Sequence, residues 1–343
     1  IETCKAGALG TLPALNQRTT AGLDEWLTRI DEELRATPGS APYGVNLIAH
    51  RTNPRLQADF EVVVEHEVPL VITSLGARED VNEAIHAYGG IVLHDVINNR
   101  FARKAIEKGA DGLIAVAAGA GGHAGTQSPF ALVREIREWF DGPLVLSGAI
   151  AHGSSLLAAV ASGADLGYIG SAFIATNEAN AVDEYKNMIV DSAAADIVYS
   201  DLFTGVHGNY LRGSIESSGL DPDNLDSSDP SAMNFGGGDS IGGAKAWKDV
   251  WGSGQGVGAV KAVGPAAELV DRLDREYAEA RERLAGRHGI RIAQGAGEAL
   301  RRFDAEARIL HLAAHLDPGQ TAFQIATHLA FLEQGDVIAR LSD

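Results

Sequence analysis

Short apolar runs alternate with amphipathic stretches along the first half of the chain. The runs are three to six residues long, which is typical of buried β-strands. Several of the stretches between them have apolar residues at helical spacing, for example residues 22–36 and 128–140. Strands that alternate with helices predict a parallel sheet with crossover helices. Seven strands are expected, at residues 8–12, 43–48, 70–73, 91–94, 112–116, 144–146 and 166–169.

A glycine-rich segment, residues 117–125, follows the fifth predicted strand. Four of its nine residues are glycine, which lets the main chain approach a ligand or another segment closely. His123 is the only titratable side chain in the segment, and an imidazole can take up or release a proton near neutral pH. The segment is therefore either a ligand loop with a catalytic histidine or a plain turn with a solvated one.

The next two strands also end in small residues. Residues 147–149 are Ser-Gly-Ala, and residues 170–171 are Gly-Ser. Such loops expose backbone N–H groups and a hydroxyl, which together can bind a phosphate. In eight-stranded barrels the phosphate site commonly follows the last two strands. We therefore expect a phosphate at these two loops.

The composition narrows the classes of function. A formal net charge of −18 argues against binding to nucleic acid phosphates, although a local site can still attract a small anion. Cys4 is the only cysteine, so neither an intramolecular disulfide nor a cysteine-rich metal site is expected. The sequence has no apolar stretch of about 18 residues and no visible signal peptide. The expectation is a cytoplasmic protein without a membrane span.

Several ordered motifs resemble the nitronate monooxygenases, formerly called 2-nitropropane dioxygenases. The three most specific are Ala-Gly-Gly-His-Ala-Gly at 120–125, Leu-Ser-Gly-Ala-Ile at 146–150 and Tyr-Ile-Gly-Ser-Ala-Phe at 168–173. Other similar segments bring the resemblance to roughly residues 3 to 275. The resemblance implies an FMN-dependent TIM barrel that oxidises a small anionic nitronate with dioxygen, giving a carbonyl compound and nitrite.

The same resemblance assigns roles to individual residues. His123 is the implied catalytic residue, as a base or as a hydrogen-bond donor to the nitronate. Some members of the family have a basic residue near the flavin at the position of Asp95, so this chain differs from them there. The implied cofactor contacts are Asn46, Thr73, Gly121, Gly122, Ser147, Gly148, Ala149, Gly170, Ser171 and Gln255.

A barrel of this family has eight strands, and the resemblance implies that the missing one is the first. Because the sequence also begins with Ile1, we expect the natural N-terminus to be absent. The expected organisation is an α/β barrel of TIM type without its first strand at 1–200, a lid or cap at 201–262, a helix at 263–284 and a tail at 285–343. The oligomeric state stays open.

Two parts of this organisation carry further expectations. In the lid, His207 and Tyr210 are the candidates for facing a substrate, with a plain surface loop as the alternative. The tail resembles part of a metallopeptidase-like domain of bacterial regulators of short-chain acyl-CoA metabolism, and we expect a small helical appendage. His311, His315 and His328 lack His-Glu-x-x-His spacing, so no metal is predicted.

Two other functions remain open from the sequence. The first is a flavin reductase of the enoyl-thioester or quinone type that uses NAD(P)H, because related barrels do so. The second, of a different class, is a ligand sensor without catalysis, which the regulator-like tail and the missing strand favour.

Overall fold

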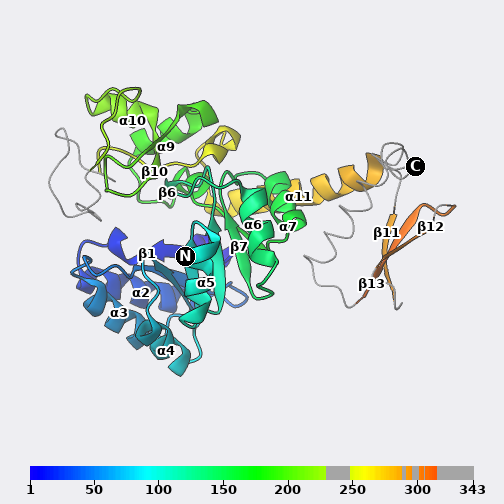
Figure 1. Cartoon of the computed structure of the whole chain (residues 1–343), viewed down its shortest axis with the longest axis horizontal. Coiled ribbons are helices and arrows are strands. Elements are labelled where there is room, and N and C mark those ends of the chain that lie inside the picture. Colours follow the sequence, from blue (N-terminus) through cyan, green and yellow to red (C-terminus); the bar gives the residue numbers. More distant parts are fainter. Residues whose placement is uncertain (229–247, 288–290, 296–300, 305, 315–343) are drawn as a thin grey trace.

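A curled parallel sheet forms the centre of the protein (Figure 1). The structure, a computed structural model, describes residues 1–228, 248–287, 291–295, 301–304 and 306–314. The sheet has seven strands in the order β1-β2-β3-β4-β5-β7-β8. All seven predicted strands are present, with boundaries within two residues of those expected. The strands are β1 (Gly10–Pro13), β2 (Tyr43–Ile48), β3 (Leu70–Ser74), β4 (Ile91–Val96), β5 (Gly112–Val116), β7 (Leu144–Ser147) and β8 (Leu166–Tyr168).

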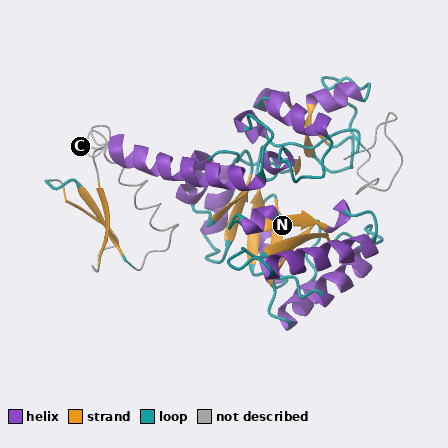
Figure 2. Cartoon of the chain, turned by 180° about the vertical axis from the view of Figure 1, so that it is seen from behind, coloured by secondary structure: helices purple, strands orange, loops and turns teal. Residues whose placement is uncertain are grey.

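Helices join consecutive strands and cover the outer face of the sheet (Figures 1 and 2). Their start signals are local, as in α5, where Asn98 at the N-cap accepts a hydrogen bond from the Phe101 amide at 3.0 Å. The connecting helices are α2 (Thr20–Arg35), α3 (Leu56–Glu65), α4 (Glu79–Ala87), α5 (Asn99–Glu107), α6 (Pro129–Arg137) and α7 (Gly153–Ser162). The predicted crossover pattern is therefore confirmed.

Both faces of the strands are buried, which explains why they appear in the sequence as short continuous apolar runs. Val45, Val71 and Val92 pack outward in one cluster with residues of α2, α3 and α4. Ile72 and Leu93 belong to a second cluster, which fills the inside of the curl with Ile114, Val145 and Tyr168. Because side chains alternate along a strand, every second residue from Ile72 also faces inward.

The sheet curls until its two end strands approach each other. Thr11 on β1 and Tyr168 on β8 share a hydrogen bond of 2.8 Å between their hydroxyl groups. This contact is between side chains, and it joins strands that are not neighbours in the ladder. The architecture is an incomplete barrel of the α/β class, as expected.

A small antiparallel sheet lies over the carboxyl ends of the barrel strands and forms a cap. Its order is β6-β10-β9, so β6, in the glycine-rich segment, pairs with a strand from much later in the chain. Short helices surround it, and residues 229–247 of the expected lid lie outside the described residues. The cap elements are β6 (Gly122–His123), α8 (Ser171–Ile174), α9 (Asp183–Asp191), β9 (Ile197–Ser200), β10 (Gly208–Leu211) and α10 (Arg212–Ser217).

The long helix α11 (Ala266–Arg287) confirms the predicted helix from residue 266 onward, extends beyond its predicted end at 284, and packs along α7. The two backbones approach so closely at Gly153 that an added Cβ would lie 2.2 Å from the Tyr277 nitrogen. The helix α1 (Glu2–Lys5) also contacts α11. Among the described residues, no helix combines the length and the apolar character needed to span a bilayer.

The described part of the tail is a three-stranded sheet, so the expected helical appendage is wrong there. The strands β11 (Arg291–Gly295), β13 (Ile309–Ala313) and β12 (Arg301–Asp304) pair in that order. Leu310 and Leu312 are both buried, with the half-buried His311 between them, which is the period-two alternation of a strand. Residues 315–343, with His315 and His328, lie outside the described residues.

Candidate functional site

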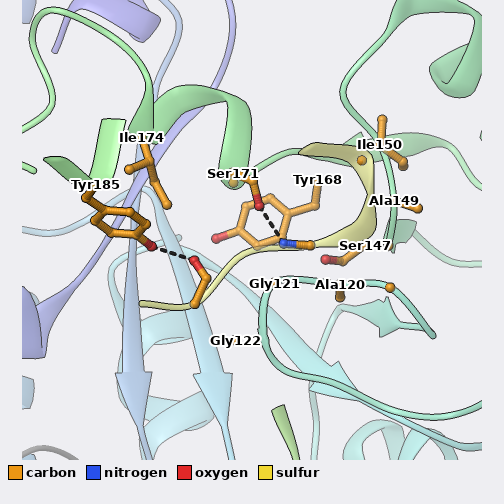
Figure 3. A pocket seen from close by; sticks show the side chains of 16 residues that line it. Ala120, Gly121, Gly122, Ser147, Ala149, Ile150, Tyr168, Ser171, Ile174 and Tyr185 are labelled. Carbon is orange, nitrogen blue, oxygen red and sulfur yellow. Dashed lines mark hydrogen bonds between the residues drawn. The ribbon is translucent and has the colours of Figure 1, made fainter. Parts of the chain in front are cut away.

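A pocket of about 280 Å³ lies at the carboxyl ends of β5, β7 and β8, beneath the cap (Figure 3). Three loops of the barrel and the turn at 252–256 line it, together with Tyr168, Ile174 and Tyr185. Seven of the ten expected cofactor contacts lie here: Gly121, Gly122, Ser147, Gly148, Ala149, Gly170 and Ser171. The structure therefore brings together residues that the sequence placed in three separate loops.

Glycines shape this pocket by letting two loops meet backbone to backbone. An added Cβ on Gly254 would lie 2.6 Å from the Gly119 oxygen, and one on Gly121 would lie 2.8 Å from the Gly254 nitrogen. Gln255, an expected cofactor contact, is exposed and outside the lining, and its amide donates to the Gly119 oxygen at 2.9 Å. The glycines of the segment 117–125 thus allow close loop-to-loop packing at the pocket.

The lining offers neutral hydrogen-bonding groups. No described residue that lines the pocket carries an acidic or basic side chain. Ser171 Oγ accepts a hydrogen bond from the Gly254 amide at 2.8 Å, which leaves its own proton to donate. An added Cβ on Gly170 would meet nothing within 4 Å, so open space lies in front of this residue. Ala149 has a φ of +54°, an unusual value for a residue with a side chain.

Asn46 lies outside the pocket lining and begins a polar row on the inner face of the sheet. Its amide donates to Ser74 Oγ at 2.6 Å, and Ser74 donates to Asp95 Oδ2 at 2.5 Å. The second oxygen of Asp95, Oδ1, is buried and has no hydrogen-bond partner in the described chain. Burial raises the pKa of Asp95 to about 6, although the Ser74 hydrogen bond acts in the opposite direction.

Thr73 lies on the opposite face of β3 from this row, because it is one residue from both Ile72 and Ser74. Its hydroxyl is 2.6 Å from His94 Nδ1, and both side chains are buried. Burial lowers the pKa of His94 to about 4. Thr73 is thus separated from the pocket, and Ser74 takes the inward position next to it in sequence.

Ser74 was expected at the barrel mouth together with Thr73, but the expected cofactor contacts include none of Ser74, Asp95 and Tyr168. The inward positions of Ser74 and Asp95 follow from the alternation of side chains along their strands. Asn46 pairs with Ile72, so Ser74 shares its face, and Asp95 occupies the matching face of β4, two residues beyond Leu93. Tyr168, two positions before Gly170, lines the pocket itself.

His123 adjoins the pocket through its neighbour Gly122 and is fixed by the cap. Its Nε2 lies 2.9 Å from the hydroxyl of Thr204, a residue that is 1% exposed. Thr204 donates to the Val206 oxygen at 3.0 Å, so its hydroxyl accepts from His123 in the tautomer that carries the proton on Nε2. In that tautomer the basic lone pair is on Nδ1. Burial lowers the pKa of His123 to about 4.

The two lid residues that were expected to face a substrate have other positions. Tyr210 is fully buried in the core of the cap, with its ring 4.8 Å from that of Phe203, so this prediction is wrong. His207 is exposed and stacks on Tyr199 with ring centroids 5.0 Å apart. In the described chain, no group of three or more His, Cys, Asp or Glu residues is arranged to hold a metal ion.

Comparisons with known proteins agree with this arrangement. A nitronate monooxygenase of Paraburkholderia phytofirmans is 26% identical over 76% of this chain and 73% of its own length. A 5-hydroxy-7a-methyl-1-oxo-octahydro-1H-indene-4-carboxyl-CoA dehydrogenase of Rhodococcus jostii is 26% identical over 63% of this chain and 60% of its own length. The structure of a nitroalkane oxidase from Streptomyces ansochromogenes superposes with a TM-score of 0.65 at 25% identity, covering 82% of this chain and 92% of the other.

A comparison with a whole family covers most of the chain. The sequence profile of the nitronate monooxygenases matches residues 2–276, which include the barrel, the cap and the first half of α11. The chain therefore belongs to the nitronate monooxygenase family of oxidoreductases.

Proposed function

We propose that this protein binds FMN and oxidises alkyl nitronates with dioxygen to a carbonyl compound and nitrite. The observation that carries the proposal is the position of His123 beside a pocket lined by seven of the expected cofactor contacts. Membership of the nitronate monooxygenase family supports the same reaction class. Propionate 3-nitronate and the anions of small nitroalkanes are the substrates to test first.

The chemical character of the pocket fits the phosphate end of FMN. Gly170, with open space before it, and the hydroxyls of Ser147 and Ser171 can donate hydrogen bonds to an anion without a charged partner. Asn46 and the inward polar row would hold polar atoms of the ring system. Thr73, which faces away from the pocket, and Gln255, which is exposed, are left out of this proposal. Bound FMN would supply the electron-accepting chemistry that no protein side chain offers.

His123 can accept a proton, although burial makes it a weak base. A pKa of about 4 keeps the imidazole neutral at physiological pH, and the tautomer that donates to Thr204 has its lone pair on Nδ1. With a neutral nitroalkane, the proton on the carbon next to the nitro group would pass to Nδ1 and leave the nitronate. A nitronate supplied as such needs no such step, so His123 would then only orient the anion.

A second candidate function is oxidation or reduction of a CoA thioester by the same pocket. The similarity to a relative named as a carboxyl-CoA dehydrogenase favours it over a quinone substrate. An enoyl-thioester reductase that uses NAD(P)H falls in the same class. A sensor without catalysis remains the alternative of another kind.

One experiment separates these functions. The purified protein is examined for flavin absorption and titrated without oxygen, first with propionate 3-nitronate and then with NADPH. Loss of the oxidised flavin spectrum on adding nitronate supports nitronate oxidation, whereas loss only with NADPH supports a reductase. A protein that stays colourless even after incubation with FMN would contradict both enzymes and support a sensor.

A further inference from the structure

An exposed apolar and basic surface lies at the edge of the barrel that carries the pocket. We call Ile97, Arg100, Phe101, Arg103 and Phe130 the rim patch. Ile97 directly follows β4, Arg100 and Phe101 are in the first turn of α5, and Phe130 is in the first turn of α6. Since β4 and β5 are adjacent parallel strands, these helix starts lie at the carboxyl edge of the sheet, as the pocket does.

Contacts between α5 and α6 hold the rim patch together. The Asn99 amide donates to the Glu135 oxygen at 3.3 Å, and the Trp139 indole donates to Asn99 Oδ1 at 2.6 Å. The Arg103 guanidinium lies 4.3 Å from the centre of the Trp139 ring. The three apolar side chains are nevertheless exposed, at 40% for Ile97, 44% for Phe101 and 64% for Phe130. A folded framework thus presents apolar groups to solvent.

The rim patch itself carries a positive charge in an acidic chain. The protein has 46 acidic residues among 343, yet residues 96–106 and 112–134 contain no Asp or Glu, and Glu107 and Glu135 directly follow these stretches. Arg100, Arg103 and Lys104 are exposed, and none of them takes part in an ion pair of the described chain, although Arg103 contacts the Trp139 ring. Several cations without an acidic partner favour a ligand with several negative charges. A small nitronate carries one charge and would not need the exposed apolar groups.

We propose that the rim patch binds the nucleotide end of a CoA thioester, so that the acyl end can approach the pocket at the same edge. Arginine guanidinium groups pair well with phosphates, and exposed aromatic rings can stack on adenine. The proposal rests on the second function given above, not on nitronate oxidation. In this proposal the rim patch recognises the charge and the ring of the nucleotide. The pocket recognises the acyl group.

Calorimetric titration of the full chain with free CoA tests the site without any turnover. The wild type is expected to bind CoA, and Arg100→Glu to weaken binding on the order of ten-fold or more, because a phosphate contact is replaced by repulsion. The matched control is Arg35→Glu, which makes the same charge change in the last turn of α2, at the opposite edge of the barrel. The control is expected to stay within about two-fold of the wild type.

Two further probes identify the part of CoA that is bound. Adenosine 3′,5′-bisphosphate should compete with CoA, and pantetheine should not. Phe101→Ala should weaken CoA binding, and its circular dichroism spectrum should match that of the wild type. Absence of CoA binding by the wild type, equal losses in Arg100→Glu and Arg35→Glu, or competition by pantetheine alone would each overturn the proposal. Because no reaction is measured, bound CoA without thioester turnover would count against the second function and not against the site.

Discussion

His123 combines a low basicity with a fixed orientation. His123→Asn removes the proton acceptor but should keep the flavin, since the pocket is lined mainly by backbone and by other side chains. Loss of a positioned base typically costs about 10²- to 10⁴-fold in rate. Turnover of a neutral nitroalkane should therefore fall by that factor, and turnover of the preformed nitronate should fall much less. Steady-state rates on both substrates provide the measurement.

The pattern of losses distinguishes the possible roles of His123. Equal losses on the two substrates would mean that the residue orients the anion instead of removing a proton. Unchanged rates with flavin bound would mean that His123 has no role in the reaction and that residues 117–125 form a plain glycine-rich turn.

Under the proposed function, Thr204 would act on the reaction through His123. In Thr204→Val the Nε2 proton loses its acceptor, so both tautomers of the imidazole become populated. We expect kcat on a neutral nitroalkane to fall on the order of ten-fold, with little change in KM. Nitrogen-15 chemical shifts of labelled His123 should report the tautomer change directly. Thr204→Ser keeps the hydroxyl and should restore both the shifts and kcat; failure of this rescue would reduce Thr204 to a packing role.

Asp95 should make the free protein less stable as the pH rises. Its pKa is about 6 in the folded chain against 3.8 as the ordinary value, so folding favours the protonated carboxyl. The contribution of Asp95 protonation to the free energy of unfolding is fully present below pH 3.8 and is lost as the pH rises through 6. It amounts to about 3 kcal/mol. Asp95→Asn should therefore be more stable than the wild type at pH 8, by up to this amount, and about equal at pH 4.

Denaturant unfolding of the flavin-free protein at several pH values measures this difference. Ser74→Ala offers a second check, because losing the Ser74 hydrogen bond should move the pH-dependent fall in stability to higher pH. A difference between wild type and Asp95→Asn that does not vary with pH would refute the assignment.

At the scale of elements, the loop after β8 offers a direct test of the phosphate site. Gly170→Ala adds a single methyl group at a φ of −111°, where no protein atom lies within 4 Å, so the variant should fold like the wild type and lose at most part of its flavin. Gly170→Glu places bulk and negative charge where the anion should bind, and its flavin content should fall at least ten-fold. Absorbance ratios of the purified variants give the flavin content. Equal content in Gly170→Glu and Gly170→Ala would place the phosphate elsewhere.

The barrel elements could be predicted because each strand is buried on both faces. Residues 70–73 and 112–116 appear as apolar runs between helical stretches, and small residues mark where strands end and ligand loops begin. The cap sheet could not be predicted in the same way. β6 has two residues, and its partner β10 lies far along the chain, so neither has a period that identifies it.

The site was predictable only as far as local signals reach. The loops at 147–149 and 170–171 could be predicted as ligand loops because they consist of small residues, and both line the same pocket. The Thr204 hydrogen bond to His123 depends on the folding of the cap and has no local signal. Thr73 was expected to be a cofactor contact and Ser74 was not. Asn46 pairs with Ile72, so alternation along β3 places Ser74 and not Thr73 on the same face as Asn46.

At the scale of the molecule, the Thr11–Tyr168 hydrogen bond links the two ends of the sheet. Burial raises the pKa of Tyr168 to about 12, so the phenol stays protonated and can take part in this bond at neutral pH. Thr11→Val and Tyr168→Phe should each lower the free energy of unfolding by about 1 kcal/mol. The double variant should lose less than the sum, because the same bond is removed twice. Full additivity in denaturant unfolding would mean that the bond does not hold the curl.

The contact between Gly121 and Gly254 sets an order of events during protein synthesis. The ribosome makes the glycine-rich segment long before the turn at 252–256 that packs against it. A nascent chain that ends before this turn has all seven strands of the described barrel sheet but lacks one wall of the pocket. Under the proposed function, such a chain should bind flavin only after residue 256 has left the exit tunnel. Flavin supply would therefore act on chains whose barrel strands have already been made.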